Sequence, residues 1–238
     1  MARNVSRRKF LSAGAGIAAA GVATGAGRQG LAQAGQEGRK PKIIAVSCSP
    51  REGKTTAQAL QFCLDAAQAV DPERIEVELI ELAGLKIPAH VAVGLPLEPG
   101  ERDDFPLVAE KLGPANVVGI LVGSPVYFCN MSALCKAFLD RCFSFRARKF
   151  ALANRVAGVV AVGGVRNGGQ ELTIQSIQAA LMCQEMLVVG DGRPRAHTGA
   201  TLWNSGKDDI SDDEFGVGTA KNLGRRVAEV ALNRLAST

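Results

Sequence analysis

The sequence predicts a three-layer α/β fold, in which a five-stranded parallel sheet is covered by helices on both faces. Five short apolar segments alternate with five segments whose apolar residues recur with the period of a helix. Most of the apolar segments are hydrophobic at consecutive positions, which is typical of parallel strands buried on both faces. Helices that connect parallel strands cover the sheet, so this alternation without a repeat predicts a single domain.

The first 34 residues are typical of an export signal and are left out of the fold. A twin arginine, Arg7-Arg8, precedes a mildly hydrophobic stretch rich in alanine and glycine, and Ala32-Gln33-Ala34 forms a cleavage site of small residues. This pattern predicts transport by the twin-arginine translocation machinery to the periplasm, or otherwise outside the cytoplasmic membrane. The alternative is a basic tail or an uncleaved membrane anchor, although five glycines between Gly14 and Gly27 disfavour a spanning helix.

The leader also accounts for the charge of the chain. The formal net charge is +5, and the leader contains five basic residues and no acids, so the rest of the chain is formally neutral. A neutral domain with one tryptophan and one tyrosine lacks the basic face and the stacking aromatics that nucleic-acid binding usually needs. We therefore expect no nucleic-acid partner.

A polar linker over residues 35–41 leads into the domain, which is expected over residues 42–238. The first strand is expected from Ile43 to Val46, where β-branched residues predominate. A helix over 57–70 follows, because its apolar residues share one face and Asp71-Pro72 ends the pattern.

Residues 75–80 alternate between apolar and charged side chains and then become apolar, which predicts an outer strand with one face more exposed to water. Residues 83–103 are rich in proline and glycine, and so long an irregular loop is usually functional or a lid. Acids at 103 and 104 favour a short helix that runs to Leu112, since negative charge stabilises a helix start.

The second half of the chain repeats the same alternation. Apolar runs predict strands over 117–122, 156–162 and 186–189. Between and after them, helices are expected over 131–145, 170–184 and 218–235, with an irregular polar segment over 190–215.

The loop after the first strand has the composition of a phosphate site. Backbone N–H groups at a helix start, hydroxyls and cations all favour a bound anion, and this loop offers each of them in Ser49, Arg51, Lys54, Thr55 and Thr56. One alternative is a nucleoside triphosphatase loop, because Gly53-Lys54-Thr55 matches its end. However, Cys48 replaces its first glycine, and neither the strand over 117–122 nor that over 156–162 runs into an aspartate that could hold magnesium. The other alternative is an ordinary turn.

Two further loops rich in glycine, proline or hydroxyl groups follow the third and fourth strands. Ligands of parallel sheets bind at the carboxyl ends of the strands. We expect the strand order 2-1-3-4-5, in which the carboxyl ends of strands one, three and four are neighbours. One ligand can therefore contact all three loops.

The motifs in these loops resemble those of the NAD(P)H-dependent FMN reductase family, which is flavodoxin-like, and particularly its branch related to iron–sulfur flavoproteins. The resemblance covers about residues 42–236. It rests on Ser49-Pro50-Arg51 with Thr55-Thr56, Gly123-Ser124-Pro125-Val126-Tyr127-Phe128 with Asn130 and Ser132, Lys136 to Arg141, Gly163-Gly164, Gly168 to Glu171, and Gly224-Arg225-Arg226.

The resemblance implies FMN as cofactor and a role for each loop. The first loop would bind the FMN phosphate through Ser49, Arg51, Thr55 and Thr56, with Lys54 nearby. The second loop would lie against the isoalloxazine ring, and the third would run along the ring edge. The ring residues would be Pro125, Val126, Tyr127, Phe128 and Asn130, and the edge residues Gly163, Gly164, Arg166 and Gly168.

Some of these side chains have competing interpretations. Tyr127 and Phe128 could instead pack in the core, and Arg166 could contact a nucleotide phosphate, an anionic acceptor or solvent. His197 is expected to be a surface histidine. A solvated acidic run with a capping role is expected for Asp208, Asp209, Asp212 and Asp213, in place of a metal site.

The chain contains six cysteines, none of them in a C-x-x-C pair, so their spacing predicts no metal site. We expect buried free thiols, with Cys48 and Cys129 as exceptions because they lie in cofactor loops. The resembled iron–sulfur proteins carry a cysteine cluster after the second strand, whereas residues 83–103 contain no cysteine, which predicts no iron–sulfur cluster. Cys129 also replaces a glycine that relatives often place beside the ring.

The resemblance implies an oxidoreductase that passes hydride from NADPH or NADH to a small-molecule acceptor such as a quinone or a flavin. No dedicated acid or base is expected, because the flavin carries the hydride chemistry. The alternative is an exported FMN-binding electron carrier that a protein partner reduces. The resemblance further implies a homodimer or homotetramer.

Overall fold

The structure of the protein, a computed structural model, describes residues 39–237. The predicted export signal (1–34) and the start of the predicted linker lie outside the described residues. Residues 39–41 have no regular structure and lead directly into the first strand.

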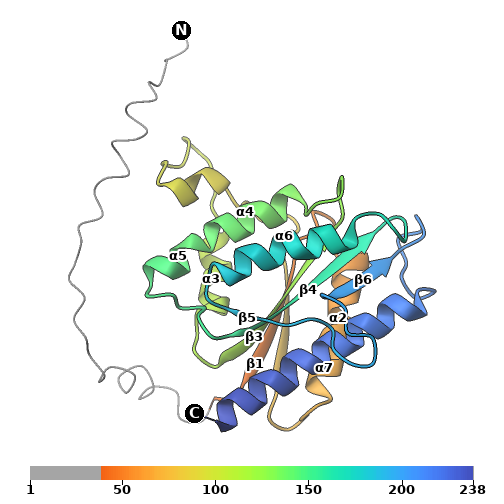
Figure 1. The fold of residues 1–238 in the computed structure, drawn as a ribbon. Coiled ribbons are helices and arrows are strands. Elements are labelled where there is room, and N and C mark those ends of the chain that lie inside the picture. Colours follow the sequence, from red (N-terminus) through yellow and green to blue (C-terminus); the bar gives the residue numbers. More distant parts are fainter. Residues whose placement is uncertain (1–38, 238) are drawn as a thin grey trace. The chain divides into compact units, whose positions relative to one another are not determined.

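A parallel sheet forms the centre of the domain, in the predicted order β2-β1-β3-β4-β5 (Figure 1). Its strands are β1 (Lys42–Ser47), β2 (Glu76–Glu81), β3 (Val117–Pro125), β4 (Val156–Gly163) and β5 (Leu187–Val188). All residues of β3 and β4 are buried, whereas β2, at the edge, is mostly half-buried. The predicted fold class, a flavodoxin-like three-layer fold, is confirmed.

The sheet also contains a sixth strand, β6 (Ala200–Trp203), inside the segment predicted to be irregular. The start of β4 pairs with β5 at Val156 and Ala157, whereas its end pairs in parallel with β6 from Val160 to Gly163. The two-residue β5 is too short to cover β4, so β6 completes the same edge. The prediction of five strands, with an irregular segment over 190–215, is therefore wrong for residues 200–203.

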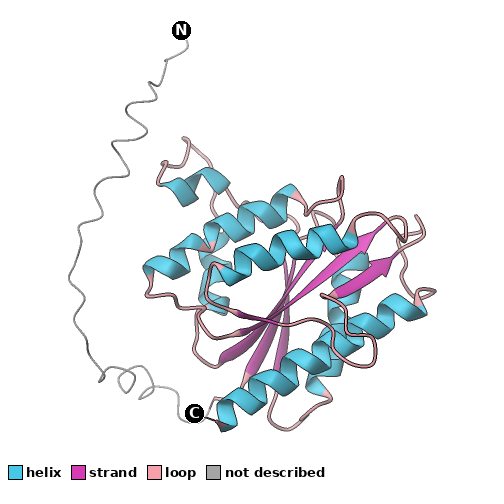
Figure 2. Cartoon of the chain, viewed as in Figure 1, coloured by secondary structure: helices cyan, strands magenta, loops and turns pink. Residues whose placement is uncertain are grey.

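Helices cover both faces of the sheet (Figures 1 and 2). One face carries α2 (Thr55–Gln68) and α7 (Glu214–Ala236). The other carries α3 (Phe105–Leu112), α4 (Ala133–Arg141), α5 (Phe143–Ala147) and α6 (Gln170–Met182), and a short 3-10 helix, η1 (Ala89–Val93), lies in the loop after β2. The predicted helix over 131–145 is therefore two helices, and α7 begins four residues earlier than expected.

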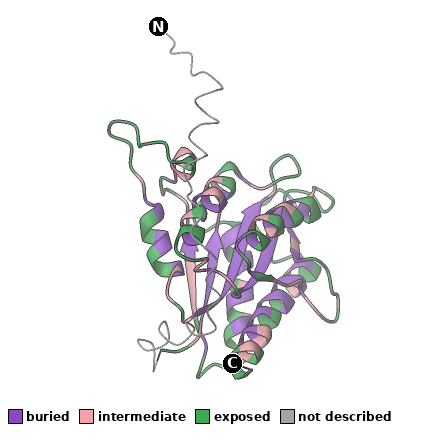
Figure 3. Ribbon diagram, turned by 60° about the vertical axis from the view of Figure 1, so that its left-hand side comes forward, coloured by how far each residue is buried: buried purple, intermediate pink, exposed green. Residues whose placement is uncertain are grey.

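The two apolar cores follow from the alternation of side chains along each strand. In β1, Ile43 and Ala45 pack on the α2 and α7 side, whereas Ile44 and Val46 pack on the opposite side. Figure 3 shows the buried strands between helices whose outer surfaces are exposed. A rigid sheet buried in this way holds the loops at its carboxyl edge in fixed positions.

The helices α2 and α7 pack closely at Gly224. A Cβ atom at this position would overlap the carbonyl oxygen of Cys63 in α2, so only glycine allows this approach. Within residues 39–237, no helix is long and apolar enough to cross a membrane.

Candidate functional site

The loops after β1, β3 and β4 meet at the carboxyl edge of the sheet. The strands are in register here, with Ser47 opposite Gly123 and Pro125 opposite Val162. The loops are also joined directly, because the hydroxyl of Ser132 donates to the carbonyl of Cys48 at 2.7 Å. The structure thus brings together the three loops that the sequence predicted to share one ligand.

The loop after β1 presents an open helix start. Ser49 forms a local turn, since its Oγ lies 3.1 Å from the backbone N of Arg51. The helix α2 begins at Thr55, and Lys54 at its N-cap provides no side-chain cap. Among the described residues, the backbone N–H groups of Thr55, Thr56 and Ala57 have no hydrogen-bond partner. Such unpaired donors favour an anion.

Acidic groups approach the same loop. Asp208 accepts two bonds from Nη1 of Arg51, at 2.7 and 2.8 Å, and lies 3.7 Å from Nζ of Lys54. The backbone N of Gly53 donates to the carboxylate of Glu81 at 2.9 Å. Asp208 therefore has a defined ionic partner within the predicted cofactor site.

The loop after β3 is a tight turn that presents two aromatic side chains. Tyr127 and Asn130 exchange backbone bonds of 2.8 and 3.0 Å. Phe128 and Cys129, between them, have positive φ angles of 50° and 59°, as both central residues of such a turn require. Phe128 is fully exposed and Tyr127 is 43% exposed, so core packing is excluded for Phe128. Pro125 is buried at the end of β3, and Val126 is half-buried.

The loop after β4 is held by the buried amide of Gln170. Its Oε1 accepts from the backbone N of Gly168 at 2.9 Å, and its Nε2 donates to the carbonyl of Val165 at 2.7 Å. Gly163 is buried as the last residue of β4, whereas Gly164 and Arg166 are exposed. A Cβ on Gly169 would lie 2.6 Å from Cα of Cys129, so this loop directly contacts the loop after β3.

Arg166 has protein partners that the sequence did not predict, and its side chain remains 42% exposed to solvent. It forms an ion pair with the buried Asp213 and lies over the rings of Trp203, at 5.3 Å, and Phe215, at 6.0 Å. Asp213 also caps α7 by accepting from the backbone N of Gly216 at 2.9 Å. The prediction of a solvated aspartate is therefore wrong for Asp213, although its capping role is confirmed.

The other residues of the acidic run behave largely as expected. Asp209 and Asp212 are exposed, and Asp209 accepts from the backbone N of Ser211 at 2.9 Å. Among the described residues, no cluster of His, Cys, Asp and Glu could hold a metal ion. His197 is exposed, as predicted, with its ring 5.8 Å from that of Phe215.

Sequence reasoning missed Trp203, the last residue of β6, and Asn204, which follows it. The indole Nε1 of Trp203 donates to the carbonyl of Gly164, and the backbone N of Asn204 donates to the carbonyl of Gly163, both at 3.0 Å. These bonds place the end of β6 against the loop after β4. The only available signal was that Trp203 is the one tryptophan of the chain.

The six cysteines are all free, but they differ in exposure. Cys63, Cys135 and Cys142 are buried as predicted, whereas Cys129 and Cys183 are exposed. Cys48 is also fully buried, and burial, together with a contact from Cys135, raises the pKa of its thiol well above the usual value. Cys48 is therefore a buried thiol like the first three, contrary to the prediction. Cys183 is an exposed thiol that was not predicted.

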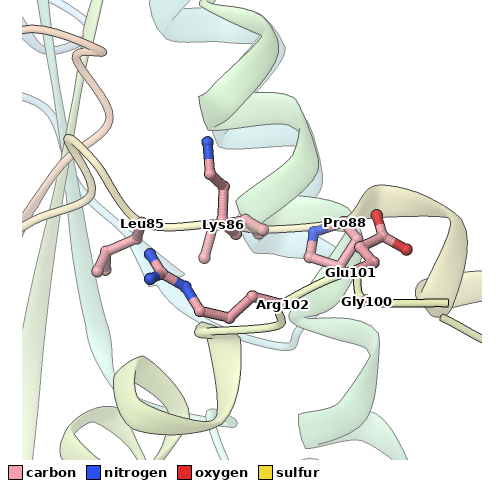
Figure 4. Close-up of a pocket in the computed structure, with 7 residues that line it drawn as sticks. Leu85, Lys86, Pro88, Gly100, Glu101 and Arg102 are labelled. Atoms are coloured by element: carbon pink, nitrogen blue, oxygen red, sulfur yellow. The ribbon is translucent and has the colours of Figure 1, made fainter. Parts of the chain in front are cut away.

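A pocket of about 510 Å³ lies in the loop after β2 and contains none of the predicted cofactor residues. Segments 85–88 and 100–102 line it, and Figure 4 shows Arg102 running back towards Leu85. The Nε of Arg102 lies 2.9 Å from the carboxylate of Asp104, which also accepts from the backbone N of Lys86 at 2.8 Å. This loop is thus a folded structure with its own ionic contacts.

Comparison with solved structures defines the class of protein. The chain resembles the flavodoxin, WrbA-like protein from Agrobacterium tumefaciens, with a TM-score of 0.57 and 18% identity over 82% of this chain and 99% of that one. At this identity the likeness shows the fold alone, which is that of a flavodoxin.

The family follows from sequence comparison. The family model described as NADPH-dependent FMN reductase matches residues 41–200, and the chain belongs to this family. An iron-sulfur flavoprotein of Methanocaldococcus jannaschii is 42% identical, with 79% of this chain and 96% of the relative covered. An NAD(P)H dehydrogenase (quinone) of Paracoccus denitrificans is 30% identical, with 61% of this chain and 77% of the relative covered.

Proposed function

We propose that this member of an FMN-dependent oxidoreductase family takes hydride from NADPH or NADH and passes electrons to a small acceptor such as a quinone or a flavin. The observation that carries the proposal is the meeting of three loops at one sheet edge, with an uncapped helix start beside Arg51 and Lys54. The family description supports the nicotinamide donor, and the quinone dehydrogenase among the relatives supports the acceptor class.

The residues fit FMN by the chemistry of their donors. The free N–H groups at the start of α2, the nearby hydroxyls of Ser49, Thr55 and Thr56, and the charge of Arg51 suit a phosphate. The exposed ring of Tyr127 or Phe128 suits one face of the isoalloxazine. When bound, FMN supplies the hydride chemistry.

This chain contributes orientation and polarity. The bonds of Gln170 fix the loop after β4, and we expect other backbone N–H and carbonyl groups of that loop to bind the polar edge of the ring. The tight turn at Phe128 holds the aromatic group above the sheet edge without support from the core. No side chain is assigned as an acid or base.

The exposed Phe128 also favours a second function, that of an electron carrier reduced by a protein partner. A fully exposed aromatic side chain at the mouth of a redox site suits contact with another protein. The two functions differ in whether a nicotinamide can reduce the flavin directly.

An anaerobic absorption experiment separates them. The purified protein is reconstituted with FMN, and its visible flavin bands are followed after NADPH, NADH or dithionite is added. Bleaching by either nicotinamide within seconds supports the reductase, and bleaching by dithionite alone supports the carrier. A protein that is colourless and does not bind added FMN contradicts both.

We also propose export by the twin-arginine route to the periplasm and assembly into a homodimer or homotetramer. The Arg7-Arg8 motif supports export, and the exposed apolar side chains of Val93, Leu95 and Phe128 support self-association. Cell fractionation with an Arg7→Lys, Arg8→Lys double variant tests export, since loss of the periplasmic form is expected. Light scattering during size exclusion tests assembly, and a monomer mass contradicts it.

A further inference from the structure

Residues 203–213, which we name the strap, join two of the loops at the sheet edge. At its start the strap is bonded to the loop after β4 through Trp203 and Asn204. At its end the buried carboxylate of Asp213 accepts from the backbone N of Trp203 at 2.8 Å and from that of Gly216 at 2.9 Å. Both ends of the strap are therefore fixed to the body of the domain.

The middle of the strap reaches the loop after β1. Both oxygens of Asp208 lie within 2.8 Å of a single nitrogen, Nη1 of Arg51. Within residues 39–237, Nε and Nη2 of Arg51 have no hydrogen-bond partner. The guanidinium is planar, so a carboxylate that holds one nitrogen also limits where the other N–H groups point.

We propose that Asp208 is a positioning residue for the cofactor phosphate. It holds Arg51 through Nη1 and leaves Nε and Nη2 for the phosphate oxygens. This inference rests on the proposed function, because it assigns that phosphate to FMN. A side chain that is already ordered loses less conformational freedom on binding, which strengthens the contact.

The negative charge of Asp208 acts in the opposite direction, because it repels the phosphate. Lys54 lies 3.7 Å from the same carboxylate and offsets this charge. Both members of the Arg51 pair are partly exposed to solvent, which screens the repulsion between carboxylate and phosphate. We therefore expect the ordering of Arg51 to be the larger effect.

The test compares two ligands that differ only in the phosphate. Dissociation constants of FMN and riboflavin are measured by quenching of flavin fluorescence with full-length apoprotein. Asp208→Asn is expected to raise the dissociation constant of FMN about threefold to tenfold and to leave that of riboflavin unchanged. Asp208→Glu is expected to retain most of the FMN affinity, since it keeps the carboxylate.

The matched control is Asp212→Asn, an exposed aspartate of the same strap that forms no ion pair among the described residues. It removes the same charge and is expected to change neither constant. FMN binding by Asp208→Asn that is unchanged or tighter overturns the inference, and tighter binding shows that Asp208 competes with the phosphate. If the unsubstituted protein binds neither flavin, the proposed function itself fails and the inference fails with it.

Discussion

Arg141 of α4 binds Asp103 through two parallel bonds, Nη1 to Oδ1 at 2.9 Å and Nη2 to Oδ2 at 2.7 Å. Its guanidinium also lies 4.7 Å from the ring centroid of Phe105. The side chains of Arg141 and Asp103 are only 8% and 13% exposed. The long loop after β2, predicted to be functional or a lid, is therefore fastened to α4 at its end.

Asp103→Asn is expected to lower the free energy of unfolding at pH 7 by about 3 kcal/mol, because it leaves the charge of Arg141 unpaired in a largely buried position. Asp140→Asn, which removes an exposed ion pair with Lys136 in the same helix, is expected to cost less than about 1 kcal/mol. Denaturant titrations measure both. Equal effects of the two substitutions contradict the assigned role of the pair.

The same pair predicts a pH dependence. Burial is the largest single effect and acts to raise the pKa of Asp103, but the hydrogen bonds from Arg141 and the backbone of Phe105, together with the charge of Arg141, outweigh it, so the pKa is lowered overall. A carboxyl whose pKa is lowered by folding stabilises the protein fully above its ordinary pKa and loses this contribution as the pH falls through the folded value. The stability difference between the unsubstituted protein and Asp103→Asn should be constant above about pH 5 and shrink below about pH 4.

Arg51→Ala is expected to raise the dissociation constant of FMN by about tenfold to a hundredfold, as for loss of a charge-assisted bond to phosphate. Riboflavin, which lacks the phosphate, should bind as before. The control is Arg74→Ala, an exposed arginine that pairs with Asp71. An unchanged FMN constant measured by fluorescence titration shows that the loop after β1 is not the phosphate site.

Phe128→Ala is expected to leave the free energy of unfolding within about 0.5 kcal/mol of its original value, because the side chain is fully exposed. If the phenylalanine ring contacts the isoalloxazine, the substitution should raise the dissociation constants of FMN and riboflavin equally, by about threefold to tenfold. Phe143→Ala removes a phenylalanine of α5 that is 53% exposed, and it should leave the binding of both flavins unchanged. Unaltered flavin binding by Phe128→Ala would assign the contact to Tyr127.

The thiols are expected to fall into two classes. Cys129 and Cys183 are exposed and should react with a disulfide reagent in the native protein, whereas the other four should react only after denaturation. Burial raises the pKa of Cys63 and Cys142 as well as that of Cys48, so little thiolate is present in any of them. Cys129→Ser should remove one reactive group, and FMN should slow the labelling of Cys129 alone.

Gly224→Ala is expected to destabilise the protein by about 3 kcal/mol, because the added methyl group separates α2 from α7. Gly218→Ala lies in the same helix, and there the new Cβ meets only the flexible end of Arg195. This control should be neutral or slightly stabilising, since alanine favours a helix over glycine. Thermal unfolding of the two variants distinguishes close packing from a general effect of substituting α7.

Local patterns were sufficient for the alternation of strands and helices, whereas the strand order was expected from the likeness to flavodoxin-like folds. An apolar run such as Ile43 to Val46 predicts a buried strand, because β-branched residues favour extended backbone and their side chains avoid water. Both properties can be read from a few consecutive residues. The boundaries were less accurate, because β3 continues to Pro125 and the helix expected over 131–145 is divided. Long-range pairing and packing determine where such elements end.

Residue types at short spacing were enough to predict the fold class, the three loops rich in glycine, proline or hydroxyl groups, and the family. Only the tertiary structure revealed β6, since four residues carry too weak a pattern and their partner in β4 lies far along the chain. The partners of the two predicted cofactor arginines were likewise invisible, because Asp208 is 157 positions from Arg51 and Asp213 is 47 from Arg166. Ion pairs at such separations exist only once the folded chain brings the groups together.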